Sequence, residues 1–152
     1  MRIEGSFIVA APPERVFAEI TNPALMASCV PGCETIEVVD PKTYRATILV
    51  EVGPIKARFN LIVEVMKEEP PSRVVSVTRG EEGSRASMLS ANNEVVLTPA
   101  AGGGTEVKYV SEVSVTGRLG KFGLGMMKKK AEQLGAKFAE TFRSKIEAAA
   151  VS

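Results

Sequence analysis

The amino-acid sequence predicts an α+β protein in which a curved antiparallel sheet surrounds one long C-terminal helix. Three features predict this fold: an alternating strand at the N-terminus, β-branched segments separated by turn residues from 34 onward, and a run with helical spacing over about 118–148. The chain has 152 residues. A chain of this length buries about two-thirds of its unfolded surface as one domain, so we expect a single domain over 1–152.

The N-terminal part is predicted to contain one strand and two short helices. Apolar and polar residues alternate over 2–10, which is typical of a half-buried strand. Pro13 and Glu14 suit the first turn of a helix, because proline needs no hydrogen-bond donor there and an acid complements the helix dipole. Asn22 followed by Pro23 repeats this start signal. We therefore expect two short helices directly after the strand.

Six further strands are predicted between residue 34 and Gly117. Turn residues divide this part of the chain at 40–41, 53–54, 70–71, 80–83 and 100–104. Alternation is clearest in three of the segments between them, 44–52, 55–65 and 107–115. Polar residues lie between the apolar ones, so one face of the sheet is expected to be covered and the other to meet water.

The long helix should lie across the inner face of this sheet. Apolar residues recur in it at helical spacings, at Leu119, Phe122, Met126, Leu134, Phe138, Phe142 and Ile146. The inner face is the only large apolar surface available to this stripe. Because many inner residues are small and tryptophan is absent, two interpretations stay open, a filled core and an apolar cavity.

If a cavity is present, residues of the sheet and the helix should line it. The residues expected to contact a bound hydrophobic molecule are Ile48, Val50, Phe59, Leu61, Val63, Leu89, Asn93, Tyr109, Ser111, Val113, Leu119, Phe122, Met126 and Leu134. Four polar residues on this face are suited to hydrogen-bond a ligand carbonyl or hydroxyl, namely Tyr44, Asn93, Tyr109 and Ser111. Buried polar groups also bond to the backbone or to one another, so both roles stay open.

Composition argues against several classes of function. The 19 basic and 18 acidic residues give a net charge of +1, which does not indicate a nucleic-acid partner. Histidine is absent, and Cys29 and Cys33 lack a third cysteine to complete a tetrahedral metal site. We interpret them as buried thiols in a turn. Glu64 and Glu94 fall on the solvent face and no acid lies within an apolar run, so no catalytic residue and no metal ligand is predicted.

The segment from Gly117 to Lys130 is basic and rich in glycine. It contains five cations, no acid, and four glycines, each of which weakens a helix by up to about 1 kcal/mol relative to alanine. One interpretation is a lid that also touches a membrane surface weakly; the other is a solvated start to a core helix. The residues expected to form the lid and membrane contact are Arg118, Lys121, Phe122, Leu124, Met127 and Lys128.

Three segments together resemble a known family. They are residues 5–17, the Cys-Val-Pro-Gly-Cys turn at 29–33, and 104–107 together with 114–119. The sequence is similar in these segments to the carbon monoxide dehydrogenase G-subunit (CoxG) family, within the SRPBCC, START-like (Bet v 1-like) helix-grip superfamily. The first and third segments are typical of the superfamily, whereas the cysteine turn is more specific to the family. The resemblance covers essentially the whole chain.

The resemblance implies a β-α-α-β6-α helix-grip fold with a deep apolar cavity. It further implies a non-enzymatic carrier of a quinone-like or lipid-like molecule that requires no cofactor and serves a molybdenum hydroxylase of the carbon monoxide dehydrogenase type. The sequence has no apolar run long enough to cross a bilayer, so we expect a cytoplasmic protein with weak contact at the inner face of the cell membrane. A cyclase or hydratase using the same cavity, and an assembly subunit without ligand, are the alternatives.

Overall fold

The protein forms one curved sheet with helices on its inner face. The computed structural model describes residues 1–83, 86–117, 119 and 124–151. The elements in chain order are β1 (Arg2–Val9), α1 (Pro13–Ile20), α2 (Pro23–Cys29), β2 (Cys33–Asp40), β3 (Thr43–Val52), β4 (Ile55–Glu69), β5 (Arg73–Glu82), β6 (Ser87–Pro99), the 3₁₀ turn η2 (Ala101–Gly103), β7 (Thr105–Gly117) and α3 (Leu124–Val151). This order confirms the predicted sequence of strand, two short helices, six strands and long helix.

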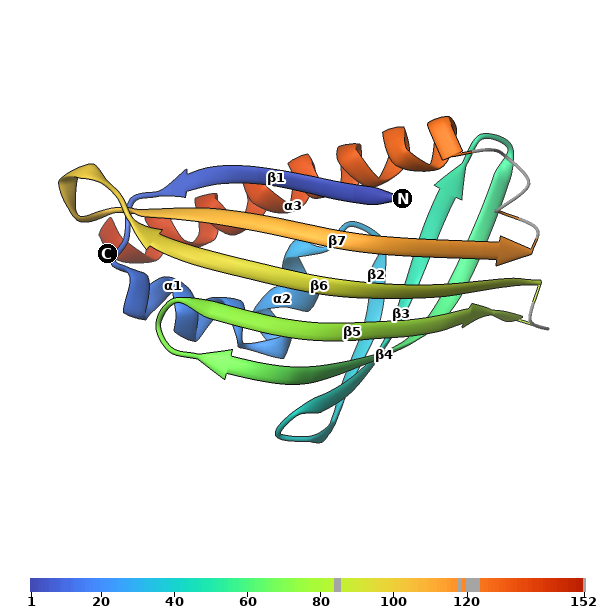
Figure 1. The fold of residues 1–152 in the computed structure, drawn as a ribbon, viewed down its shortest axis with the longest axis horizontal. Helices are drawn as coiled ribbons and strands as arrows, with labels where there is room; N and C mark the ends of the chain where they lie inside the picture. Colours follow the sequence, from blue (N-terminus) through green and yellow to red (C-terminus); the bar gives the residue numbers. More distant parts are fainter. Residues whose placement is uncertain (84–85, 118, 120–123, 152) are drawn as a thin grey trace.

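The strands form a single antiparallel sheet in the order β1-β7-β6-β5-β4-β3-β2. Strands β2 to β7 follow one another as a meander, and β1 pairs with β7, so the N-terminal strand lies beside the last one. In Figure 1, β2 and β3 run at a steep angle to β5, β6 and β7, with the long strand β4 passing between the two directions. The sheet is therefore strongly bent, as predicted.

The two short helices begin where the sequence predicts. Proline occupies the first turn of both helices. The Asn22 side chain caps α2, because its Oδ1 accepts hydrogen bonds from the backbone N–H groups of Ala24 at 3.1 Å and Leu25 at 3.4 Å. These local signals are sufficient to place both helices directly after β1.

Two buried clusters join the helices to the sheet. The α1–α3 cluster consists of Val9, Ala11, Val16, Phe17, Cys29, Leu97, Val107, Phe142 and Ile146. The β3–β4 cluster consists of Val52, Ala57, Phe59 and Leu119. They lie at opposite ends of the inner face, so the space between sheet and helices is closed at both ends by apolar packing.

Helix α3 packs most extensively against β1 and also meets α2 and β3 (Figure 1). Phe142 lies on its packed face and is completely buried. Met126 was expected to line the cavity but is 45% exposed, whereas its neighbour Met127 packs against the β3–β4 cluster. At 3.6 residues per turn, Met126 is about 160° around the helix from Phe142 and therefore points away from the sheet. The spacing of apolar residues along the helix alone did not show which side of α3 faces the sheet.

Two boundaries differ from the predicted ones or fall outside the described residues. The sequence predicts a turn over 80–83, but Gly80 lies within β5, opposite Leu61 on one side and Leu89 on the other. A Cβ atom on Gly80 would clash with the Leu61 side chain, so glycine there gives Leu61 room on the inner face. The predicted helix start near 118 lies where only Leu119 is described. No helix in the described ranges combines the length and apolarity that crossing a bilayer requires.

Candidate ligand-binding site

A pocket of about 300 Å³ lies on the inner face of the sheet beside α1 and α2. Its lining residues are Ile20, Thr21, Pro23, Met26, Val38, Asp40, Pro41, Tyr44, Val65, Glu68, Val74, Ser76 and Val95. Most of these side chains are apolar, and they come from both short helices, from the five neighbouring strands β2 to β6, and from the turns beside them. This volume is at the lower end of the range typical of small-molecule sites.

A row of polar side chains crosses the middle of the inner face. Asn93 on β6 lies between Ser76 and Thr78 on β5 and Ser111 on β7. Asn93 Nδ2 donates hydrogen bonds to Thr78 Oγ1 at 3.0 Å and Ser76 Oγ at 3.4 Å, and Ser111 Oγ donates to Asn93 Oδ1 at 2.8 Å. We call these four residues the polar band. Ser76 is the member of the band that lines the pocket, so the band begins at the pocket wall and continues from there across the inner face.

Tyr109 lies on the inner face between β1 and α3. A Cβ atom on Gly135 would lie 2.9 Å from Tyr109 Oη, and one on Gly5 would lie 2.6 Å from Tyr109 Cζ. The ring therefore fills space that these two glycines leave free. Burial, and secondarily the charge of Glu132, raises the pKa of Tyr109, so its hydroxyl is protonated at neutral pH. No hydrogen bond joins that hydroxyl to a described residue.

The inner face is not fully covered between the two clusters. Phe142 and Phe59, within the clusters, are 0% and 3% exposed. Val63, Ser111 and Val113 also face inward, yet they are only half-buried. A filled core would have buried these side chains as completely as the cluster residues. These three side chains therefore remain partly accessible on the inner face, which favours the cavity interpretation over a filled core.

The structure places the sequence-predicted cavity residues in two regions of the inner face. Those in the β3–β4 cluster or packed against it are Ile48, Val50, Phe59, Leu61, Leu89 and Leu119. Those on the strands between the two clusters are Val63, Asn93, Tyr109, Ser111 and Val113. Leu134 is half-buried on α3, Phe122 lies outside the described residues, and Met126 points away. The residues of the β3–β4 cluster close one end of the inner face. The residues between the two clusters are therefore nearer to the pocket beside α1 and α2.

Sequence reasoning missed most of the pocket wall. Its residues from α1 and α2, such as Ile20 and Met26, were not among those expected to line a cavity. Ser76 and Thr78 were also missed, because a short hydroxyl side chain in a β-branched strand carries no distinctive signal. Tyr44 was expected to face inward and lines the pocket, where burial raises its pKa.

Half of the predicted lid residues, Arg118, Lys121 and Phe122, lie outside the described residues. Of Leu124 only the backbone is described. Lys128 is exposed, whereas Met127 lies on the packed side of α3. The structure therefore places the end of this segment at the edge of the β3–β4 cluster.

The cysteine turn is held against β3. Gly32 has φ of 81°, and the backbone N–H of Leu49 donates a hydrogen bond to the Gly32 oxygen at 2.9 Å. Both thiols are free. Cys29 is buried in the α1–α3 cluster, but Cys33 is only half-buried, and burial raises its pKa. The buried-thiol interpretation therefore fits Cys29 and not Cys33.

One buried acid was not expected. Glu82 at the end of β5 is 7% exposed and lies opposite Phe59 on β4. The sequence predicts a turn there because glycines flank this residue at 80 and 83. Along β5, Glu82 is about 13 Å from Thr78 at 3.3 Å per residue, so it is not part of the polar band.

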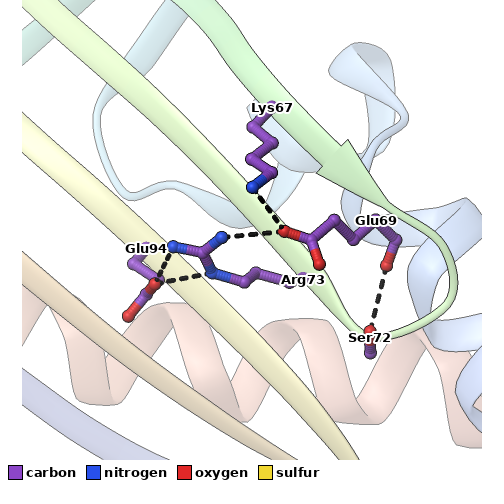
Figure 2. A network of polar contacts seen from close by, with 5 residues as sticks. All are labelled: Lys67, Glu69, Ser72, Arg73 and Glu94. Atoms are coloured by element: carbon purple, nitrogen blue, oxygen red, sulfur yellow. Dashed lines mark hydrogen bonds and ion pairs between the residues drawn. The ribbon is translucent and has the colours of Figure 1, made fainter.

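A charged network holds the β4–β5 turn next to the pocket. Arg73 bonds to Glu94 at 2.6 Å and to Glu69 at 2.8 Å, and Lys67 bonds to Glu69 at 3.1 Å (Figure 2). The hydrogen bonds from Lys67 and then Arg73 lower the pKa of Glu69. The adjoining residues of β4 and β5 line the pocket, so this network fixes part of its wall from the solvent face.

A larger groove, of about 840 Å³, lies on the opposite face of the sheet. Its lining residues are Thr35, Glu37, Arg45, Ala46, Thr47, Asn60, Leu61, Ile62, Arg79, Gly80, Glu81, Met88, Leu89, Ser90, Ser114 and Thr116. By register, most of these side chains face away from the helices and are polar. A hydrophobic molecule needs an apolar enclosure, so we assign the candidate site to the smaller inner pocket.

Comparison with known proteins identifies the family. The sequence model of the carbon monoxide dehydrogenase G-subunit (CoxG) matches residues 5–147. The chain belongs to the CoxG family. This confirms the resemblance carried by the three segments. No curated protein matches this CoxG-family chain in sequence.

Solved structures share the fold of this CoxG-family protein at low sequence identity. A conserved protein from Geobacillus kaustophilus has a TM-score of 0.89 and 23% identity over 97% of this chain and 96% of that chain. A START superfamily protein from Mycobacterium smegmatis has a TM-score of 0.76 and 14% identity, covering 97% of both chains. The Zhui aromatase/cyclase from a Streptomyces species has a TM-score of 0.68 and 15% identity over 97% of this chain and 93% of that chain.

These likenesses show a START-like helix-grip fold and confirm the predicted fold class. Family and fold together indicate a ligand-binding helix-grip protein.

Proposed function

We propose that this protein binds and carries a hydrophobic small molecule, quinone-like or lipid-like, in the pocket between the inner face of the sheet and the helices α1 and α2. The supporting observation is the incompletely covered inner face, where a mostly apolar pocket meets a single polar band between two closed clusters. Apolar walls with a few convergent polar groups are typical of small-molecule sites. No cofactor is required for carriage.

The proposed partner is a molybdenum hydroxylase of the carbon monoxide dehydrogenase type. Membership of the CoxG family supports this partner. We place the carrier in the cytoplasm, in transient contact with the inner face of the cell membrane, because a hydrophobic ligand has to be exchanged with a lipid phase.

An enzyme of the cyclase or hydratase kind is a second candidate. The buried acid Glu82 and the shared fold with an aromatase/cyclase favour it. However, Glu82 lies about 13 Å along β5 from the polar band, too far to act on a group bound there. We therefore prefer the carrier.

Filling the pocket should abolish carriage. Ser76→Phe places an aromatic ring in the pocket wall, so the affinity for decylubiquinone or monoolein should fall at least about tenfold, because a loss of about 1.4 kcal/mol suffices. Titration calorimetry of the purified variant measures this fall. Ser6→Phe, on the exposed face of β1, is the matched control and should leave the affinity unchanged.

Organic extraction of the purified wild-type protein, followed by mass spectrometry, should release a molecule with a long apolar tail. Absence of any extracted species together with no binding of either probe would contradict the proposal and favour an assembly subunit. Recovery of a chemically altered probe would instead favour the enzyme.

The membrane contact is testable with vesicles. Lys128 and Lys129 are exposed near the start of α3, beside the exposed Met126. Because each lysine near an anionic surface contributes about 1 kcal/mol, Lys128→Glu/Lys129→Glu should weaken binding to phosphatidylglycerol-rich vesicles at low salt at least about tenfold. Co-sedimentation measures the bound fraction.

The matched control for this experiment is Lys137→Glu/Arg143→Glu, which changes the charge equally on exposed positions farther along α3. It should retain most of the binding. If the wild-type protein bound phosphatidylglycerol and phosphatidylcholine vesicles equally poorly, the membrane contact would have to be abandoned, while ligand binding would be unaffected.

A further inference from the structure

The hydrogen bonds of the polar band determine the direction of each donor. Asn93 Nδ2 lies 3.5 Å from the backbone oxygen of Ser76, which can only accept, so the carboxamide nitrogen faces β5. Asn93 Oδ1 then accepts from Ser111. The hydroxyl oxygens of Thr78 and Ser76 accept from Nδ2, which leaves the hydrogens of both hydroxyls available to a further acceptor.

Tyr109 adds a third donor on the same face. It precedes Ser111 by two residues on β7, about 7 Å along the strand. Its hydroxyl is protonated at neutral pH and makes no hydrogen bond to a described residue. The inner face thus presents several neutral donors, while the amide oxygen in the band is already occupied.

The charges around the pocket are unfavourable for an anion. The charged residues that line it, among those the structure describes, are Asp40 and Glu68. Lys42 forms an ion pair with Glu68 at 3.2 Å but does not itself line the pocket. A carboxylate entering this pocket would lose its hydration and gain only neutral donors, next to two acids. An uncharged carbonyl loses far less hydration and accepts the same hydrogen bonds.

We infer that the polar band binds the polar end of the ligand, and that this end is an uncharged hydrogen-bond acceptor such as a carbonyl oxygen, not a carboxylate. The inference rests on the proposed carrier function and adds to it the position and the chemistry of the ligand's polar end. Ser76 and Thr78 are the donors, and Asn93 and Ser111 orient them. The apolar remainder of the ligand packs against the pocket wall.

A matched series of ligands with 12-carbon chains tests the inference. At pH 8, 2-dodecanone should bind the wild-type protein at least about tenfold more tightly than dodecanoate. Ser76→Ala/Thr78→Val removes both donors with little change in volume and should weaken 2-dodecanone binding about tenfold. Binding of 1-dodecene, which has no acceptor, should not change. The control Ser6→Ala/Thr98→Val makes the same substitutions on the exposed face and should leave all three affinities unchanged.

The outcomes separate this inference from the carrier function. Dodecanoate binding as tightly as 2-dodecanone, or an unchanged ketone affinity in the double variant, overturns the inference and leaves carriage intact. Failure of all three ligands to bind the wild-type protein overturns both. Thermal unfolding establishes that the double variant is folded; if it is not, the two single variants replace it, each with an expected loss of about threefold.

Discussion

Phe142→Ala should lower the free energy of unfolding by about 3–5 kcal/mol, the range for removing a fully buried aromatic ring. Phe142 is completely buried in the α1–α3 cluster. Its ring meets Phe7 of β1 edge-on at 6.2 Å and stacks on Phe138 at 5.6 Å. The substitution leaves a cavity at the point where α3 joins the sheet. Urea or guanidinium unfolding, followed by circular dichroism, measures the change.

The neighbouring Arg143→Ala is the control, because Arg143 is exposed on the same turn of α3. Its effect should stay within about 0.5 kcal/mol. A loss below about 1 kcal/mol for Phe142→Ala would show that α3 is not held at this end. The closed end of the candidate site would then have to be reconsidered.

Gly32→Ala should destabilise the protein by more than about 2 kcal/mol, for two separate reasons. Gly32 has φ of 81°, a left-handed conformation that costs an alanine about 1–2 kcal/mol. In addition, a Cβ atom at this position would clash with the backbone oxygen of Leu49 on β3, so the cysteine turn and the strand would have to separate. Chemical denaturation provides the measurement.

Gly102→Ala separates these two causes. Gly102 also has a positive φ, of 74°, but a Cβ atom there would meet no heavy atom within 4 Å. The free energy of unfolding of this variant should therefore fall only by the cost of placing an alanine in the left-handed conformation. Equal losses in the two variants would disprove the role of the close approach between Gly32 and Leu49.

Local signals in the sequence were sufficient to predict the helices and strands. Asn22 and Pro23 mark the start of α2 because a side-chain cap and a proline act within one turn. The strands around Tyr44 and Tyr109 were predicted from alternation, since the side-chain period of two assigns each residue to a face. The family was predicted in the same way, from short segments that include the cysteine turn.

The site could be predicted only in part. Asn93, Tyr109 and Ser111 were expected on the inner face, and the register of β6 with β7 places them there. The pairing of Asn93 with Ser76 and Thr78 on β5 was not expected, because it joins residues from separate strands whose relative register no local pattern specifies.

The sequence by itself determined the order of the elements, the two faces of the sheet and the family, because these depend on periodicity and on contacts between chain neighbours. Only the tertiary structure decided that Met127 and not Met126 faces the sheet, that Glu82 is buried, and that a pocket lies on the inner face beside α1 and α2. These features depend on how α3 is rotated and how far the sheet bends. Both are set by packing between segments far apart in the chain, which no local pattern in the sequence encodes.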